Sequence, residues 1–335
     1  MAEYLYKHTG IFYTESGDRI KNLELSYHTY GELNAAKNNV VWVCHALTAN
    51  ADVLDWWSGL FGENDLFSPK EHFIICVNIP GSCYGSTGPL SGEKPLFDKF
   101  PKLTVRDIVN GLEILRNHLK IKNINVLIGA SLGGQQALEW SIKKPRIFQQ
   151  LILLATNAKH SAWGIAFNES QRMAIENDPV YKNRDRHSIS KGLKTARSIA
   201  MLSYRSYNGY VLTQSSEDDS TEVYPAISYQ QYQGEKLAKR FNPWSYHLLT
   251  HVMDSHNVGR SRAGVQEALK SVKANTLVIG VSSDLLFPVI EQKVLSEGIA
   301  TANYAEIDSL FGHDGFLIET EQLTKHIAKF LKENK

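Results

Sequence analysis

The sequence has few cysteines and no long apolar run. Its 335 residues include only Cys44, Cys76 and Cys83, whose spacing matches no metal-binding pattern. An odd number of cysteines, two of them in apolar strand-like runs, indicates reduced thiols and therefore a cytoplasmic protein. No apolar run approaches the roughly 20 residues that span a bilayer, and the N-terminus lacks the basic and apolar regions of a signal peptide. We therefore expect neither membrane association nor secretion.

An excess of charge of one sign is also missing. Lys and Arg total 36 and Asp and Glu total 35, which gives a formal net charge of +1. Nucleic-acid and anionic-membrane surfaces need a basic excess, so we expect neither partner. His247 and His251 have a helical spacing that could suit a metal ion, but no third ligand completes a site. We therefore expect no metal and no resident cofactor.

Apolar runs alternate with helical patterns between residues 40 and 155. Helix 104–118, which begins with Thr104 and Asp107, separates two of the predicted strands. Alternation of this kind predicts a mostly parallel, doubly wound sheet covered on both faces. A hairpin with strands at 11–13 and 23–27 is predicted ahead of it. The apolar runs that predict the strands of the sheet are 40–45, 73–78, 124–128 and 151–155.

The alternation stops at Thr156 and returns only near residue 276. From about 160 to 270 the pattern is helical, apart from a polar loop at Gln214–Thr221 that we expect to be exposed. Strands follow again at 276–281 and 304–307, and a helix at 319–332 closes the chain. We therefore predict a catalytic domain formed by residues 1–158 and 272–335, interrupted by a helical lid at residues 159–271.

The stretch Gly129-Ala130-Ser131-Leu132-Gly133 joins a predicted strand directly to a predicted helix. It matches G-x-S-x-G, the nucleophile elbow of α/β-hydrolases. Small residues two positions before and after the serine let the chain fold back without Cβ clashes. The helix N-terminus also places partial positive charge beneath the apex, which suits a nucleophile that becomes negative. The pattern predicts that Ser131 is a nucleophile.

A serine nucleophile needs a base, and the base needs an orienting acid. Asp284 follows the predicted strand 276–281, and His313 follows the strand 304–307. Ligands of such sheets sit at the carboxyl ends of the strands, which meet at one edge. The chain order Ser131, Asp284, His313 is the order of the triad in α/β-hydrolases, and it predicts both this fold and these catalytic residues.

Two backbone N–H groups are candidates for an oxyanion hole. Leu132 directly follows the predicted nucleophile. Leu47 lies just after His45, which ends the strand 40–45, where an α/β-hydrolase places its second oxyanion donor. We predict that the N–H groups of Leu47 and Leu132 stabilise the developing oxyanion, each contributing on the order of a few kcal/mol.

Several stretches spread over nearly the whole chain resemble the homoserine O-acyltransferase family of α/β-hydrolases. In that family the elbow usually reads Gly-Gly-Ser-Met-Gly-Gly, whereas Ala130 and Leu132 stand here. The elbow still fits, because alanine is small and Leu132 contributes only its backbone N–H. The matching stretches are His45–Thr48, Trp56-Trp57 with Gly59-Leu60, Gly81–Pro89, Gly133–Trp140 and Gly312–Leu317.

The resemblance implies a reaction. Ser131 would take the acetyl group of acetyl-CoA, and the side-chain hydroxyl of L-homoserine would then receive it, giving O-acetyl-L-homoserine for methionine biosynthesis. The family binds its amino-acid substrate with an arginine for the carboxylate and an aspartate for the amine. Arg197 and Asp314 match these positions, and Arg205 is the alternative to Arg197. A homodimer joined through lid helices is also implied.

Other functions remain open from sequence alone. A lipase- or esterase-like hydrolase would use the same three residues, and a binding protein could keep the fold without catalysis. Succinyl-CoA could replace acetyl-CoA, or L-serine could replace L-homoserine. One methylene in a pocket changes selectivity by only about 1–3 kcal/mol, so the sequence discriminates weakly between these substrates.

Overall fold

The computed structural model describes residues 2–216 and 224–334. Most of the predicted polar loop at Gln214–Thr221 lies outside these residues. None of the described helices is both long enough and apolar enough to cross a lipid bilayer.

Eight strands of the described chain form one sheet, in which β1 and β4 run antiparallel to their neighbours and the other six run parallel to one another. This arrangement confirms the predicted α/β-hydrolase fold with a mostly parallel, doubly wound sheet. In spatial order the strands are β1 (Ala2–Lys7), β4 (Glu24–Tyr30), β6 (Phe73–Val77), β5 (Val40–Cys44), β7 (Ile124–Ala130), β8 (Phe148–Leu154), β9 (Asn275–Val281) and β10 (Ala302–Ile307).

The register of the parallel strands aligns their carboxyl ends. Cys44 pairs with Gly129, and Ala130 pairs with Leu154. At the far end of the sheet, Ile307 pairs with Val281. The loops that follow β5, β7, β9 and β10 therefore leave the same edge of the sheet, which is where ligands bind in folds of this class.

The predicted hairpin is wrong in its second strand. β2 (Ile11–Tyr13) pairs with β3 (Arg19–Lys21), whereas β4 belongs to the main sheet between β1 and β6. β4 is buried along most of its length rather than on alternate residues, because the sheet is covered on both faces there. The edge strand β1, largely exposed, was not predicted at all.

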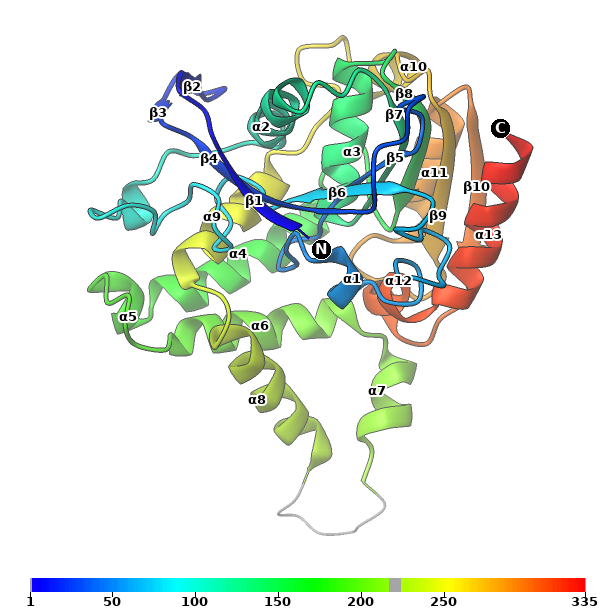
Figure 1. The fold of residues 1–335 in the computed structure, drawn as a ribbon. Helices are drawn as coiled ribbons and strands as arrows, with labels where there is room; N and C mark the ends of the chain where they lie inside the picture. The colour runs from blue at the N-terminus through cyan, green and yellow to red at the C-terminus, as the bar shows by residue number, and fades with distance from the viewer. Residues whose placement is uncertain (1, 217–223, 335) are drawn as a thin grey trace.

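Helices cover both faces of the sheet, and α13 lies along the outer side of β10 in Figure 1. α2 begins with Thr104 and Asp107, as the sequence predicts, and the two form a capping box in which each bonds the other's backbone N–H group. One face packs against α2 (Val105–His118), α3 (Leu132–Lys143) and α11 (Val289–Gly298). The other face packs against α1 (Val53–Trp56), α12 (Gly315–Ile318) and α13 (Thr320–Glu333).

Between β8 and β9 the described chain is helical. α4 packs against α6 and α9, and α6 packs against α8. Figure 1 shows α5, α6, α7 and α8 beyond one edge of the sheet, with α7 and α8 projecting farthest. The division into a catalytic domain and a lid stays a prediction. The helices are α4 (Ala162–Glu176), α5 (Pro179–Lys182), α6 (Lys191–Tyr204), α7 (Tyr207–Gln214), α8 (Pro225–Ala238), α9 (Pro243–Asp254) and α10 (Val265–Lys270).

Candidate active site

Ser131 is the single residue between β7 and α3. Its backbone has φ 57° and ψ −126°, a conformation that non-glycine residues rarely adopt and that costs on the order of 1–3 kcal/mol. Three hydrogen bonds hold it there. The Ser131 N–H donates to the Leu154 carbonyl (3.0 Å), and the Ser131 carbonyl accepts from the Gln135 N–H (3.1 Å) and from the Thr156 hydroxyl (2.9 Å). The turn is therefore as sharp as the sequence predicts.

The glycines of the elbow are required by close backbone approach. A Cβ on Gly129 would collide with the carbonyl oxygen of Gly133, and a Cβ on Gly133 would collide with the carbonyl oxygen of Cys44. The first contact lets α3 fold back onto its own strand, and the second brings α3 against the end of β5. Small residues two positions before and after the serine thus serve the purpose expected of them.

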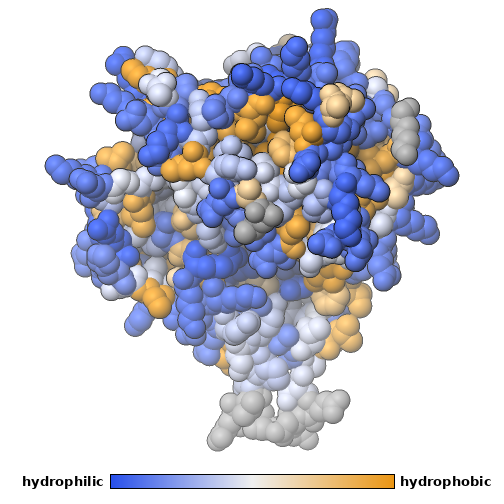
Figure 2. Space-filling model, viewed as in Figure 1, coloured by the Kyte–Doolittle hydropathy of each residue, from blue (hydrophilic) through white to orange (hydrophobic). Residues whose placement is uncertain are grey.

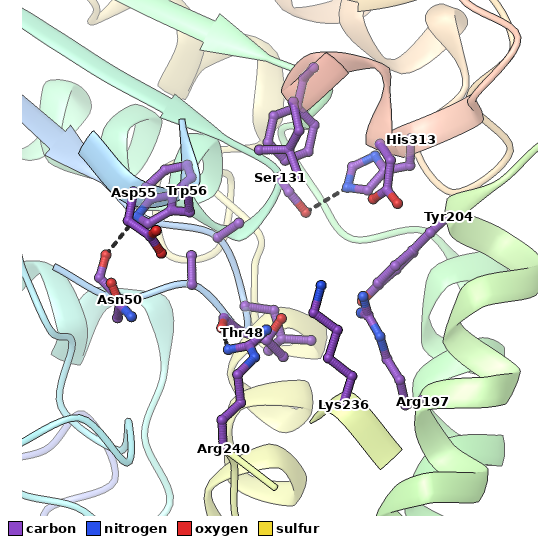
Figure 3. A pocket seen from close by; sticks show the side chains of 16 residues that line it. Thr48, Asn50, Asp55, Trp56, Ser131, Arg197, Tyr204, Lys236, Arg240 and His313 are labelled. Atoms are coloured by element: carbon purple, nitrogen blue, oxygen red, sulfur yellow. Dashed lines mark hydrogen bonds between the residues drawn. The ribbon is translucent and has the colours of Figure 1, made fainter. Parts of the chain in front are cut away.

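Ser131, His313 and Asp284 form a continuous hydrogen-bonded chain. His313 Nε2 lies 2.9 Å from Ser131 Oγ, and His313 Nδ1 lies 2.6 Å from Asp284 Oδ2. The first of these bonds is drawn in Figure 3. Asp284 Oδ1 accepts the backbone N–H groups of Leu286 (2.8 Å) and Phe287 (2.9 Å), which fixes the carboxylate. With this order of groups, the imidazole can take a proton from the serine while the carboxylate stabilises the resulting cation.

Aromatic rings hold the imidazole of His313 in its plane. Phe287 stacks on it at 5.1 Å between centroids, and Phe316 meets it edge-on at 5.3 Å. Tyr204 of α6 lies 5.7 Å away. His313, Asp284 and Ser131 are each at most 5% exposed. The ring therefore has little freedom to leave the serine.

His45 positions the loop that carries Leu47. Complete burial lowers the pKa of His45 to about 4, so the ring is neutral at physiological pH. Its Nδ1–H donates to the Ala46 carbonyl (2.8 Å), and its Nε2 accepts the Ile79 N–H (3.2 Å). Gln136 of α3 donates to the His45 carbonyl (3.1 Å), which ties the end of β5 to the elbow helix.

The two predicted oxyanion donors are Leu132, which follows Ser131 in the chain, and Leu47, which lies on a different loop beside it. Leu132 is the first residue of α3, so its N–H has no acceptor within the helix and remains available for a ligand. Leu47 lines the same cavity as Ser131. The positions fit an oxyanion hole, and the assignment itself stays a prediction.

A cavity of about 430 Å³ opens in front of Ser131 and His313. The loop after β5 forms one wall, and α6 and α8 supply the opposite one (Figure 3). Its lining residues are Ala46, Leu47, Thr48, Ala49, Asn50, Asp55, Trp56, Ser131, Arg197, Tyr204, Lys236, Arg240, His313, Asp314, Phe316 and Leu317.

Both predicted substrate-binding residues line this cavity. Arg197 reaches it from α6, with its guanidinium 5.1 Å from the centre of the Tyr204 ring. Asp314 reaches it from the turn after His313. Arg205, the alternative to Arg197, does not line the cavity and instead pairs with Asp314, with 3.4 Å between Nε and Oδ2. The placement favours Arg197 as the cation available to a ligand.

Sequence reasoning predicted no role for several polar residues of the cavity, among them Tyr204, Lys236 and Arg240. Tyr204 could have been predicted from its spacing. It follows Arg197 by seven residues, which is about two helical turns, so both side chains lie on one face of the predicted helix. Burial raises the pKa of Tyr204 despite the opposing effect of the Arg197 cation, so its hydroxyl stays protonated. Lys236 and Arg240 gave no comparable signal.

Glu139 and Trp140, at the end of one stretch that carried the family resemblance, lie away from this cavity. The Trp140 indole N–H donates to the Glu113 carboxylate of α2 (3.0 Å). Glu139, 2% exposed, forms an ion pair with Arg262. Both therefore join α3 to neighbouring elements rather than contacting a ligand.

Comparisons with known proteins agree with this architecture. The family model described as the alpha/beta hydrolase fold matches residues 39–320. The chain is 47% identical over 324 residues to a homoserine O-acetyltransferase of Cyclobacterium marinum, covering 96% of this chain and 92% of that one. It is 38% identical to a homoserine O-acetyltransferase of Nostoc punctiforme, with 97% and 94% covered.

Solved structures give the same picture. Homoserine O-acetyltransferase from Staphylococcus aureus superposes with a TM-score of 0.83 at 32% identity, covering 98% of this chain and 95% of that one. Esterase E22 reaches a TM-score of 0.86 at only 21% identity, with 98% and 99% covered, and shows the shared fold alone. The chain therefore belongs to the homoserine O-acetyltransferase family, a group of acyltransferases with the α/β-hydrolase fold.

Proposed function

We propose that this chain transfers the acetyl group of acetyl-CoA to the side-chain hydroxyl of L-homoserine through an acyl-Ser131 intermediate. The product, O-acetyl-L-homoserine, would enter methionine biosynthesis. One observation carries the proposal: the chain of hydrogen bonds from Asp284 through His313 to Ser131 opens into a cavity that also holds Arg197 and Asp314. A nucleophile thus lies next to groups that complement an amino acid.

In the first half-reaction His313 Nε2 accepts the proton of Ser131 Oγ, and the oxygen attacks the thioester carbonyl. A C–O bond forms, and the carbonyl oxygen becomes an oxyanion that the N–H groups of Leu47 and Leu132 stabilise. The C–S bond then breaks, and the departing CoA thiolate takes the proton from His313. The acetyl group is left on Ser131 as an ester.

In the second half-reaction L-homoserine replaces CoA. His313 accepts the proton of its side-chain hydroxyl, and the oxygen attacks the ester carbonyl. The bond to Ser131 Oγ breaks, and His313 returns the proton to the serine. Each substrate therefore reacts in turn with the same residue, which makes the kinetics ping-pong.

Arg197 and Asp314 hold the amino acid for this step. A guanidinium can bind a carboxylate through two parallel N–H groups, and the Asp314 carboxylate can accept from the ammonium group. The Tyr204 ring under Arg197 limits where the guanidinium can lie. Holding both charged groups on the α-carbon directs the side-chain hydroxyl to the acyl group in place of water.

A homodimer through the inserted helices is part of the proposal. α7 exposes Tyr207 (79%) and Leu212 (65%), and α8 exposes Tyr232 (59%). Figure 2 shows apolar side chains on the α7 side of the projecting helices. Exposed apolar residues gathered on one surface typically mark an interface. Light scattering at increasing protein concentration tests this, and L212D should shift the mass to that of a monomer.

The proposed location is the cytoplasm. The three unpaired cysteines fit its reducing environment.

The experiment that tests the reaction follows CoA release by the purified protein. Acetyl-CoA and succinyl-CoA are each supplied with L-homoserine, with L-serine or with neither. We expect release to be fastest with acetyl-CoA and L-homoserine, and intact mass spectrometry to detect an acetyl group on Ser131 when the acceptor is left out. Equal CoA release from acetyl-CoA with and without L-homoserine would instead identify an esterase-like hydrolase. Faster turnover with succinyl-CoA or L-serine would reassign the donor or the acceptor.

A further inference from the structure

Two cations, Lys236 in α8 and Arg240 just after its C-terminal end, have no role in the triad or in the proposed amino-acid site. Lys236 and Arg240 are four residues apart, so they lie on one face of the helix end. Both line the cavity that contains Ser131. Figure 3 shows Lys236 extending from α8 into this space, with Arg240 beside it next to Thr48.

Neither cation is paired with a carboxylate of the described part of the chain. Within residues 2–216 and 224–334, no carboxylate lies within ion-pair distance of Lys236 or Arg240. Glu235, the neighbour of Lys236 in sequence, is paired with Lys194 of α6 at 3.0 Å. The ammonium of Lys236 lies 6.0 Å from the Tyr232 ring, its one recorded partner in the described chain.

Arg240 is fixed in position. Its Nη1 donates to the Thr48 carbonyl and to the Tyr84 hydroxyl, both at 2.6 Å. A guanidinium has five N–H donors, so these two bonds orient the group and leave donors for a ligand. Because Thr48 follows Leu47, the cation is anchored to the loop that carries a predicted oxyanion donor.

The charges that line the cavity exceed the needs of the amino acid. Among residues 2–216 and 224–334, five charged side chains line it: Asp55, Arg197, Lys236, Arg240 and Asp314. If the proposed function holds, Arg197 and Asp314 take the carboxylate and the ammonium of L-homoserine. Two cations and only Asp55 then remain, which leaves a net positive wall for the other substrate.

We propose that Lys236 and Arg240 form a docking pair for an anionic group of the acyl donor. The inference rests on the proposed function, because it requires a thioester donor at Ser131. Two parts of such a donor are anionic: the phosphates of the CoA carrier, and the terminal carboxylate of a dicarboxylic acyl group. Ammonium and guanidinium groups bind both, so the chemistry is shared and the source must be found by experiment.

A two-by-two set of donors separates the sources. Acetyl and succinyl groups are each supplied on CoA and on N-acetylcysteamine, a carrier without phosphates, with L-homoserine as the acceptor. kcat/KM is measured for the wild type and for K236M, R240M and the double variant. K236R and R240K keep the charge, and they show whether losses in the Met variants come from charge or from lost packing on Thr48 and Tyr84. K239M is the matched control, since Lys239 lies on the same helix end but outside the cavity.

We expect each Met variant to lower kcat/KM about three- to tenfold for donors that carry the recognised anion, through KM rather than kcat. A loss with both CoA thioesters and with neither N-acetylcysteamine thioester assigns the phosphates. A loss with both succinyl thioesters and with neither acetyl thioester assigns the carboxylate. The KM for L-homoserine should stay unchanged in every variant, as should all constants of K239M. Charge-keeping variants should recover most of the loss.

Equal losses with all four donors, or no loss with any of them, would overturn the docking pair. Either result leaves the proposed reaction intact as long as the wild type acetylates L-homoserine. A wild type that transfers no acyl group to L-homoserine from any of the four thioesters would instead refute the proposed function itself.

Discussion

Asp284→Asn tests the proposed role of the carboxylate behind His313. In the folded protein Asp284 Oδ1 accepts the N–H groups of Leu286 and Phe287, and Oδ2 faces His313 Nδ1 at 2.6 Å. An asparagine must keep its carbonyl oxygen on the two backbone donors, because its NH2 group would repel them. The NH2 group therefore faces Nδ1, which has to become an acceptor.

The magnitude follows from the tautomer. With Nδ1 accepting, the neutral imidazole carries its proton on Nε2, the atom that lies 2.9 Å from Ser131 Oγ. Nε2 can then no longer take the serine proton, and the cation that forms during transfer loses its neighbouring charge. We expect kcat to fall by about 10⁴-fold, which corresponds to about 5.5 kcal/mol in the activation barrier.

The assay measures CoA release with a thiol reagent and acetylation of Ser131 by rapid quench and intact mass spectrometry. Both half-reactions should slow, because the same imidazole acts in each. Circular dichroism and thermal unfolding check that the variant folds. Asp308→Asn is the control, since Asp308 also follows a strand of the sheet but bonds Ser282 and does not line the cavity. A folded D284N protein that acetylates Ser131 within tenfold of the wild-type rate would refute the reasoning.

Three further predictions concern other residues. Arg197→Met should raise the KM for L-homoserine about 10- to 100-fold without slowing acetylation of Ser131, whereas Arg205→Met should raise it less; an equal effect in steady-state kinetics would contradict the assignment. Burial lowers the pKa of His256 to about 3, whereas the same group in the unfolded chain titrates near 6.5. The contribution of His256 to the free energy of unfolding should therefore be fully present above pH 6.5 and should decrease as the pH falls towards 3. Urea unfolding from pH 7 to 4 measures this decrease, and His256→Asn should make it smaller. Trp140→Phe removes the bond to Glu113 from a fully buried site and should cost about 2–3 kcal/mol in the free energy of unfolding, with kcat unchanged; a loss below about 0.5 kcal/mol would show that the bond contributes little.

The parts of the site at the strand ends could be located from the sequence. Ser131, Asp284 and His313 each follow an apolar run, and parallel pairing brings the ends of such runs to one edge whatever the rest of the chain does. The distances between their side chains could not be predicted, because they depend on two turns of irregular backbone. The strand β2 was predicted, but its partner β3 was missed, because Arg19-Ile20-Lys21 has too few apolar residues to signal a strand.

The inserted helices were harder to interpret, and the reason is physical. α8 has Gly234 and Leu237 buried but exposes Ile227 and Tyr232, so its apolar residues do not define one inward face. Which side of α8 faces the cavity is decided by its packing against α6, where a Cβ on Gly234 would collide with the backbone of Lys194. This close approach fixes the rotation of α8, and the exposed Lys236, about 200° around the helix from Gly234, lines the cavity. The catalytic residues thus lie at the carboxyl edge of the sheet, which the hydrophobic pattern of the strands reveals. The residues proposed to select substrates lie on helices whose orientation depends on tertiary contacts. Substitutions in α6 and α8 should therefore change substrate preference while the geometry of Ser131 and His313 is preserved.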